Sequence, residues 1–217
     1  MGFFDLFRKK TVEQGDAEAQ YNLGIRYGNG QGVPQSDAKA LKYIQKAANQ
    51  GYAKAQHQLG IMYHDGLGVP QSDIKAVEWY QKAANQGFAY AQHSLGGMYR
   101  DGRGVVRNDV KAVEWLQKAA NQGFANAQCV LGSMYYHGRG VPQSDTKALE
   151  WYQKAAAQGD SEAKQFFNFI QSRYAPTYWT GIVSSFPIVY GSPIILHTET
   201  FLLSIPITIP PSYITDN

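Results

Sequence analysis

A repeat of 36 residues constrains this chain more than any other feature of its sequence. The segment 49–84 (NQGYAKAQHQLGIMYHDGLGVPQSDIKAVEWYQKAA) is nearly repeated at 85–120 and again at 121–156. A fixed period of this length indicates an array of one small structural unit, because each copy buries its apolar face against the next. We expect four full units over about residues 12–156 and a fifth that stops after its first half. Glycines mark the common register at Gly15, Gly51, Gly87, Gly123 and Gly159.

Each unit is predicted to contain two helices. In the second unit Ala55, Leu59 and Tyr63 recur at i, i+4 and i+8, which gives one apolar stripe at helical period. The second half of the unit carries a further stripe of apolar and small residues. Gly60 beside Leu59 would cost a helix about 1 kcal/mol relative to alanine. Its recurrence in every full unit therefore predicts a close helix crossing that leaves no room for a side chain.

The glycine-rich segment DGLGVPQSD (65–73) is interpreted as the turn between the two helices. A phosphate-binding P-loop needs GxxxxGK[ST], and a dinucleotide fingerprint needs GxGxxG after a strand. This segment has neither pattern, and versions of it occur in all four units. Ser72 or Asp73 is expected to cap the helix that follows.

The two ends of the repeated region differ from its middle. Directly after the repeat glycine the inner units carry Tyr52, Phe88 and Phe124, whereas the outermost copies carry Asp16 and Asp160. A terminal position has no neighbouring unit to pack against, so polar residues are expected there. Residues 160–174 continue as one amphipathic pattern, which we expect to form a helix that caps the stack.

The period, together with the AxxxLGxxYxxGxGV and KAxxWYQKAA runs, resembles Sel-1-like repeats, which are relatives of tetratricopeptide repeats. The resemblance covers about residues 12–173. It implies an all-α fold, a right-handed α-solenoid of antiparallel helix pairs, and the role of an adaptor or scaffold, often in bacteria. The first unit departs from the pattern with Tyr43 in place of tryptophan, and the third has Val106 in place of the loop proline.

Three regions follow from this organisation. Residues 1–11 are expected to form a short lead-in helix, and 12–174 four repeats with a capping half-repeat. Residues 3–10 (FFDLFRKK) would dock on the array or make a weak peripheral contact with a membrane, and we favour docking. The tail 175–217, rich in Pro, Ile and Thr, would be extended or disordered, or would arise from a shifted reading frame. Prolines interrupt its apolar stretches, so no run of about 20 apolar residues predicts a transmembrane helix.

Composition narrows the class of partner. The net charge is +3, with 20 Lys and Arg interspersed with 17 Asp and Glu, which does not indicate nucleic-acid binding. A single cysteine, Cys129, excludes an internal disulfide framework. The first ten residues lack the order of a secretory signal, so we expect a cytoplasmic protein, with secretion without a recognisable signal as the alternative.

Two recurring patterns are candidate chemical sites. Glu78, Glu114 and Glu150 each precede a lysine by four residues, which predicts solvated ion pairs. His57, His93 and Cys129 share one register, but two neighbouring ligands do not complete a zinc site, so these are expected to be ordinary surface positions. The sequence contains neither GxSxG nor HExxH. We therefore expect no metal, no cofactor and no catalytic residue.

The remaining candidate is a surface for a protein or peptide. Certain first-helix positions vary between units while the stripe residues repeat, and their spacing puts them on one face. By resemblance to tetratricopeptide arrays this face lines a concave groove, although neutral drift on an exposed face would give the same variation. The candidate partner-binding residues are His57, Ile61, His64, Tyr90, His93, Arg100, Asn126 and Tyr136.

The sequence thus predicts a non-catalytic adaptor or scaffold that binds a protein or peptide in the groove. A first alternative is a secreted effector or host-interaction protein of a bacterium. A second is a β-lactam-binding or β-lactam-hydrolysing enzyme, as implied by cysteine-rich relatives in Helicobacter. Those relatives carry cysteine pairs in each repeat, whereas this chain has one cysteine in all.

Overall fold

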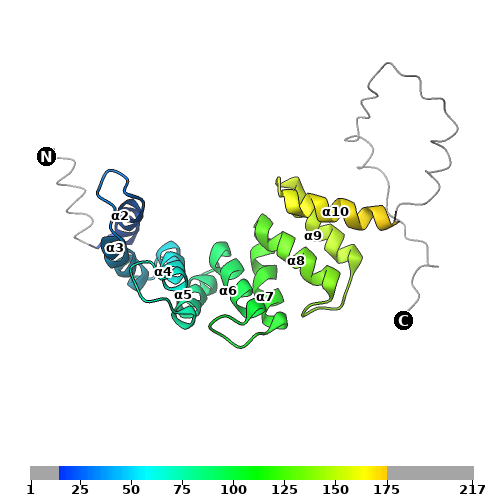
Figure 1. The fold of residues 1–217 in the computed structure, drawn as a ribbon, viewed down its shortest axis with the longest axis horizontal. Helices are drawn as coiled ribbons and strands as arrows, with labels where there is room; N and C mark the ends of the chain where they lie inside the picture. Colours follow the sequence, from blue (N-terminus) through cyan, green and yellow to red (C-terminus); the bar gives the residue numbers. More distant parts are fainter. Residues whose placement is uncertain (1–14, 175–217) are drawn as a thin grey trace, which may run out of the picture. The chain divides into compact units, whose positions relative to one another are not determined.

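The computed structural model describes residues 15–174, and over this range it consists of nine α-helices without strands (Figure 1). The predicted all-α fold is confirmed. The lead-in at 1–11, the membrane-contact segment 3–10 and the tail at 175–217 lie outside the described residues. The helices are α2 (Ala17–Asn29), α3 (Asp37–Asn49), α4 (Ala53–Asp65), α5 (Asp73–Asn85), α6 (Ala89–Asp101), α7 (Asp109–Asn121), α8 (Ala125–His137), α9 (Asp145–Ala157) and α10 (Ser161–Tyr174).

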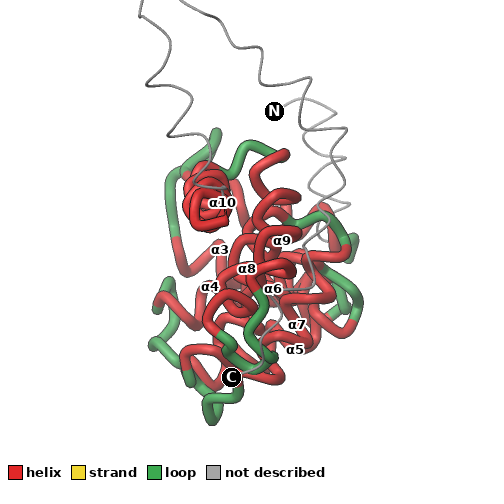
Figure 2. The backbone as a smooth tube through the Cα atoms, turned by 90° about the vertical axis from the view of Figure 1, so that its right-hand side faces the viewer, coloured by secondary structure: helices red, strands yellow, loops and turns green. Residues whose placement is uncertain are grey.

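The helices pack in the order in which they occur along the chain. Each even-numbered helix from α2 to α8 pairs most extensively with the odd-numbered helix that follows it, and each odd-numbered helix contacts the next even-numbered one (Figures 1 and 2). The last helix, α10, packs on α9 and touches α8. Such nearest-neighbour packing is the defining property of a repeat array. No helix within residues 15–174 is long and apolar enough to cross a membrane.

The recurrent helix glycines lie where the two helices of a pair cross. A Cβ atom on Gly60 would stand 2.5 Å from the Tyr80 ring, and one on Gly96 would stand 2.7 Å from Cγ of Leu116. Separations below 3.0 Å essentially never occur for real Cβ atoms. The close crossing predicted from sequence is therefore confirmed, and it explains why this position tolerates the low helix propensity of glycine.

The glycine-rich segment forms the turn inside each helix pair. Gly66 ends α4 in the left-handed conformation, at φ 75°, which glycine adopts more readily than residues that carry a Cβ. The hydroxyl of Ser72 accepts a hydrogen bond from the Lys75 backbone N–H at 3.4 Å, so Ser72 is the N-cap and Asp73 lies in the first turn of α5. The turn also lies against the preceding repeat, because a Cβ on Gly68 would be 2.9 Å from the Asp37 carbonyl oxygen. These contacts support the interpretation of the segment as a structural turn.

The buried core runs between the helices of each pair and on to the next pair. In α4, Ala55 and Leu59 are fully buried, as the apolar stripe predicts, whereas Tyr63 is only partly buried. In α5, Ala76 and Tyr80 are buried in the next core cluster, together with Ala91 and Leu95 of α6. Small residues bring the helices close together, and larger side chains, such as Leu59 and Met62 of α4, fill the remaining space.

The residue before each first helix caps that helix at the ends of the array but packs against a neighbouring unit in the interior. Asp16 accepts a hydrogen bond from the Glu18 backbone N–H at 3.0 Å, and Asp160 accepts one from the Ala163 N–H at 2.9 Å. The corresponding inner residues Tyr52, Phe88 and Phe124 give no side-chain cap to their helices. An aromatic ring is stabilised there by the neighbouring unit, whereas an end position gains more from capping the helix.

The predicted ion pairs between Glu78, Glu114 and Glu150 and the lysines that follow them are wrong. Within residues 15–174 these glutamates make no ion pair with those lysines. Instead, Nζ of Lys82 lies 3.7 Å from the ring centroid of Trp79, and the equivalent distances at the third and fourth units are 3.9 Å and 4.1 Å. An exposed ion pair contributes little in water, whereas the half-buried indole offers the lysine a ring face and apolar cover for its stem.

Candidate functional site

Five aromatic side chains from three consecutive repeats form one cluster on the first-helix side of the array. They come from α4, from α6 and from the residues that directly precede α6 and α8. The ring of Tyr90 lies 4.7 Å from that of Phe124 and 5.4 Å from that of Phe88, measured between centroids. His57 lies 5.5 Å from Phe88, and His93 lies 5.2 Å from Phe124. We call His57, Phe88, Tyr90, His93 and Phe124 the aromatic cluster.

Tyr90 is the exposed member of the aromatic cluster. Its side chain is 54% exposed, while His57, Phe88, His93 and Phe124 are partly buried. Its ring stands between Phe88 and Phe124, so its position is determined by packing on two sides. An exposed aromatic ring that is already held in place loses little rotational freedom when another molecule covers it.

The two histidines of the aromatic cluster are packing residues with lowered pKa values. Burial, with a smaller contribution from the charge of His93, lowers the pKa of His57 to about 4. Burial also lowers the pKa of His93, with Arg100 adding to the effect. Nε2 of His57 lies 3.2 Å from the hydroxyl of Ser94 in the next repeat. The prediction that these are ordinary surface positions is wrong, because both rings lie between neighbouring repeats.

The third residue of that register, Cys129, is also buried. Burial, followed by the nearby carboxylates of Asp160 and Glu162, raises the pKa of its thiol to about 12. The thiolate form that acts as a nucleophile or metal ligand is therefore strongly disfavoured. Among residues 15–174 no group of three His, Cys, Asp or Glu side chains is arranged to hold a metal ion.

Three of the predicted partner-binding residues lie at the C-terminal ends of the first helices, in polar contacts of their own. Nδ1 of His64 is 2.9 Å from Oδ1 of Asp73, and the same carboxylate pairs with Arg103 of the next repeat at 3.1 Å. Arg100 donates two hydrogen bonds to Asp101, at 2.7 Å and 3.0 Å. The hydroxyl of Tyr136 accepts a hydrogen bond from Arg173 at 3.0 Å. Asp73 with Arg103, and Tyr136 with Arg173, thus link different repeats, whereas the contact of Arg100 stays within its own helix.

The eight predicted residues therefore do not form a single cluster. The structure brings His57, Tyr90 and His93 together in the aromatic cluster. Ile61 instead packs, partly buried, against the core that α5 and α6 form. Asn126 is exposed at the start of α8, in the register position that Tyr90 occupies in α6. Phe88 and Phe124 were interpreted only as packing residues, although they complete the aromatic cluster.

Sequence reasoning also missed a row of buried glutamines beside the aromatic cluster. Gln56 is 6% exposed, accepts a hydrogen bond from Gln86 at 2.7 Å and donates to the Ala48 carbonyl of the preceding repeat at 3.2 Å. One signal in the sequence could have revealed this row. Glutamine recurs at this position in every unit, whereas neighbouring polar positions vary between units. The row consists of Gln20, Gln56, Gln92 and Gln128.

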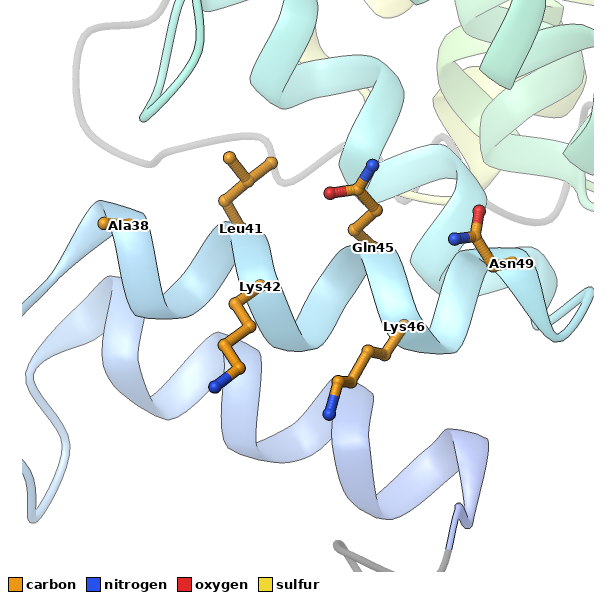
Figure 3. A pocket seen from close by; sticks show the side chains of 6 residues that line it. All are labelled: Ala38, Leu41, Lys42, Gln45, Lys46 and Asn49. Atoms are coloured by element: carbon orange, nitrogen blue, oxygen red, sulfur yellow. The ribbon is translucent and has the colours of Figure 1, made fainter.

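A shallow depression lies along α3 (Figure 3). In the close-up Leu41, Gln45 and Asn49 project from one side of the helix, and Lys42 and Lys46 from the other. All of its lining residues belong to this one helix, and they include no His, Cys, Asp or Glu. Lys42 and Lys46 are therefore its only ionisable side chains, and no carboxylate or imidazole in the lining could exchange a proton with them. The lining residues are Ala38, Leu41, Lys42, Gln45, Lys46 and Asn49.

Helix pairs of constant length, stacked in one register and carrying different surface side chains, define an α-solenoid repeat protein. The family model described as Sel1 repeat matches four consecutive segments, at residues 17–52, 53–88, 89–124 and 125–160. The chain belongs to the Sel1 repeat family. A comparison with curated proteins found no match.

Solved structures of bacterial proteins share this fold. A protective antigen of uropathogenic Escherichia coli is 40% identical, with a TM-score of 0.75 over 76% of this chain and 36% of that one. A Sel1 repeat protein from Oxalobacter formigenes is 38% identical, with a TM-score of 0.70 over 76% of this chain and 48% of that one. An immunity protein from Pseudomonas aeruginosa is 29% identical, with a TM-score of 0.50 over 72% and 58%. This chain thus matches less than half the length of the first two.

Proposed function

We propose that this chain is a non-catalytic adaptor that binds a protein or peptide through the face formed by its first helices. Sel1 repeat proteins generally mediate protein–protein interaction, and the family is generally non-catalytic. The observation that carries the proposal for this chain is Tyr90, which is 54% exposed and held between Phe88 and Phe124. Tyrosine is among the residues that contribute most to binding at interfaces.

The histidines beside Tyr90 and the cysteine at their register position in α8 favour binding over turnover. The two histidines of the aromatic cluster have lowered pKa values, and the Cys129 thiol has a raised one. A general base near neutral pH needs a pKa close to the working pH, and a nucleophilic thiol needs a lowered one. We accordingly expect purified protein to give no turnover of nitrocefin, the reaction that the β-lactam alternative requires.

A cytoplasmic location remains part of the proposal, with secretion as its alternative. Fractionation of cells that express the gene, with the chain detected by an antibody in cytosol, envelope and medium, separates the two. Recovery in the medium without cell lysis would favour a secreted effector.

Affinity purification with a matched pair of variants tests the adaptor proposal. Tyr90→Ala removes the exposed ring, whereas Ile74→Ala removes a 63% exposed apolar side chain at the start of α5, away from the aromatic cluster. A partner captured by the wild type and by Ile74→Ala, but not by a Tyr90→Ala variant of normal helical content, is the expected result. Equal capture by all three proteins would show that the partner does not bind through the aromatic cluster.

A further inference from the structure

Two adjacent glycines in α6 differ in what surrounds them. Gly96 is needed for packing, since a Cβ there would stand 2.7 Å from Cγ of Leu116. A Cβ on Gly97 would meet nothing within 4 Å. Glycine inside a helix costs about 1 kcal/mol relative to alanine, so packing gives no reason for it at 97. Other first helices carry side chains at this register position, namely Ile25, Ile61, Ser133 and Phe169.

Gly97 lies on the face of α6 that carries the predicted partner-binding residues. Tyr90 precedes it by seven positions, His93 by four, and Arg100 follows it by three, a spacing that puts all four on one side of the helix. The equivalent positions on the neighbouring helices α4 and α8 are Ile61 and Ser133. Gly97 is itself partly buried, but the space that its side chain would occupy, on this face of α6, is open. Glycine at such a place allows another molecule to approach the main chain closely.

The charges around Gly97 determine which kind of molecule suits it. Near neutral pH both histidines of the aromatic cluster are uncharged, because burial lowers their pKa values. Arg100 is bound to Asp101 by two hydrogen bonds, so its charge is already compensated. A charged group brought against this surface would lose water without gaining an unpaired partner, which is costly. The surface is complementary to an uncharged, apolar group.

We propose that the open space at Gly97, which we call the seat, binds an apolar side chain of an uncharged, extended peptide segment. The peptide crosses α6 and packs against Tyr90. This rests on the proposed function and specifies its partner. The exposed amide of Asn126, at the start of the next first helix, supplies a donor and an acceptor for the backbone of such a peptide. At the same register position Ile61 of α4 packs partly buried against the core and α8 carries Ser133, whereas a Cβ on Gly97 would meet nothing within 4 Å.

The experiment fills the seat with a residue that the fold accepts. Gly97→Ile introduces the side chain that α4 carries at the same position, and isoleucine has a higher helix propensity than glycine. Peptides selected from a random phage-displayed library on the full-length wild-type chain are then synthesised. Their dissociation constants are measured by fluorescence anisotropy against the wild type, Gly97→Ile, Tyr90→Ala and Ile74→Ala.

The expected peptides have an uncharged centre with aliphatic residues or proline. Gly97→Ile should weaken them at least about tenfold, the loss that corresponds to about 1.4 kcal/mol, without lowering the thermal midpoint. Ile74→Ala should bind as the wild type does. Peptides that lose affinity with Tyr90→Ala but not with Gly97→Ile would overturn the seat and leave the proposed adaptor function standing.

Three other outcomes would also overturn the inference. Selected peptides that share a charged centre would contradict the uncharged occupant. Recovery of no peptide above background would remove the peptide itself as the occupant. A dimer in sedimentation experiments that Gly97→Ile dissociates would assign the seat to a second copy of the chain.

Discussion

The side-chain amide of Gln86 donates a hydrogen bond to Oε1 of Gln56 at 2.7 Å, although the two residues are 30 positions apart. Gln56 in turn donates to the Ala48 carbonyl of the preceding repeat. The arrangement recurs as Gln122 with Gln92 and as Gln158 with Gln128, at 2.8 Å in both cases. Because a buried amide without partners is costly, each pair favours one relative placement of adjacent repeats over shifted alternatives.

Removing one buried glutamine should destabilise the array. Gln92→Leu leaves the Ala84 carbonyl without the hydrogen bond that it receives at 3.2 Å, and we expect a loss of about 1–3 kcal/mol in the free energy of unfolding. Urea unfolding followed by circular dichroism measures it. The control is Gln117→Leu, whose amide donates to exposed Asn121 and should change the stability by less than about 0.5 kcal/mol. Equal effects of the two changes would contradict a special role for the buried row.

The neighbouring glycines of α6 should respond to alanine with opposite signs. Gly96→Ala forces a methyl group against Leu116 and should destabilise the protein by about 1–3 kcal/mol through overpacking. Gly97→Ala adds its methyl group to open space and should stabilise the helix by up to about 1 kcal/mol. Thermal midpoints of the two variants, measured side by side, decide the matter. A destabilised Gly97→Ala variant would mean that the backbone there needs glycine for the fold itself.

Acid should weaken the interface around the aromatic cluster. The pKa of His57 is about 4 in the folded protein, against an ordinary value of 6.5. Between those values the unfolded chain binds more protons than the folded one, so stability falls as the pH falls from about 6.5 to 4. His57→Tyr introduces the residue that the first repeat has at this position, Tyr21, and should reduce the pH dependence in that range. Unfolding midpoints at a series of pH values test this, and an unchanged slope would argue against burial of a neutral histidine.

The lysines over the tryptophans should matter more than the glutamates beside them. Lys82→Gln loses the contact of its ammonium group with the Trp79 ring at 3.7 Å, and we expect a cost of about 0.5–1 kcal/mol. Glu78→Gln should be nearly neutral, since Glu78 makes no ion pair with Lys82 in the structure. Chemical denaturation of both variants and of the double variant gives the comparison. A larger loss for Glu78→Gln would restore the ion pair predicted from the sequence.

Much of the architecture could be predicted because it depends on local rules repeated in each unit. The positions of Gly60 and Gly66 predicted a tight crossing and a turn, and Ser72 was one of the two residues expected to cap the next helix. The candidate site could be predicted only in part. That His57 would lie beside Phe88, and His64 share Asp73 with Arg103, depends on how one repeat rests on the next. A period gives the register of equivalent residues but not the rotation and offset that decide which non-equivalent residues meet.

The sequence alone determined the unit, the number of its copies in the array and the stripe each helix buries, because propensity, apolar spacing and turn chemistry act over a few residues. Only the tertiary structure decided the rest. It placed the two histidines between repeats instead of on the surface, turned the lysines toward tryptophan, and paired the buried glutamines across helices. It also showed that Gly97, beside the tightly packed Gly96, faces open space. These outcomes arise where surfaces from different repeats meet, because burial there sets the balance among packing, charge and hydrogen bonding.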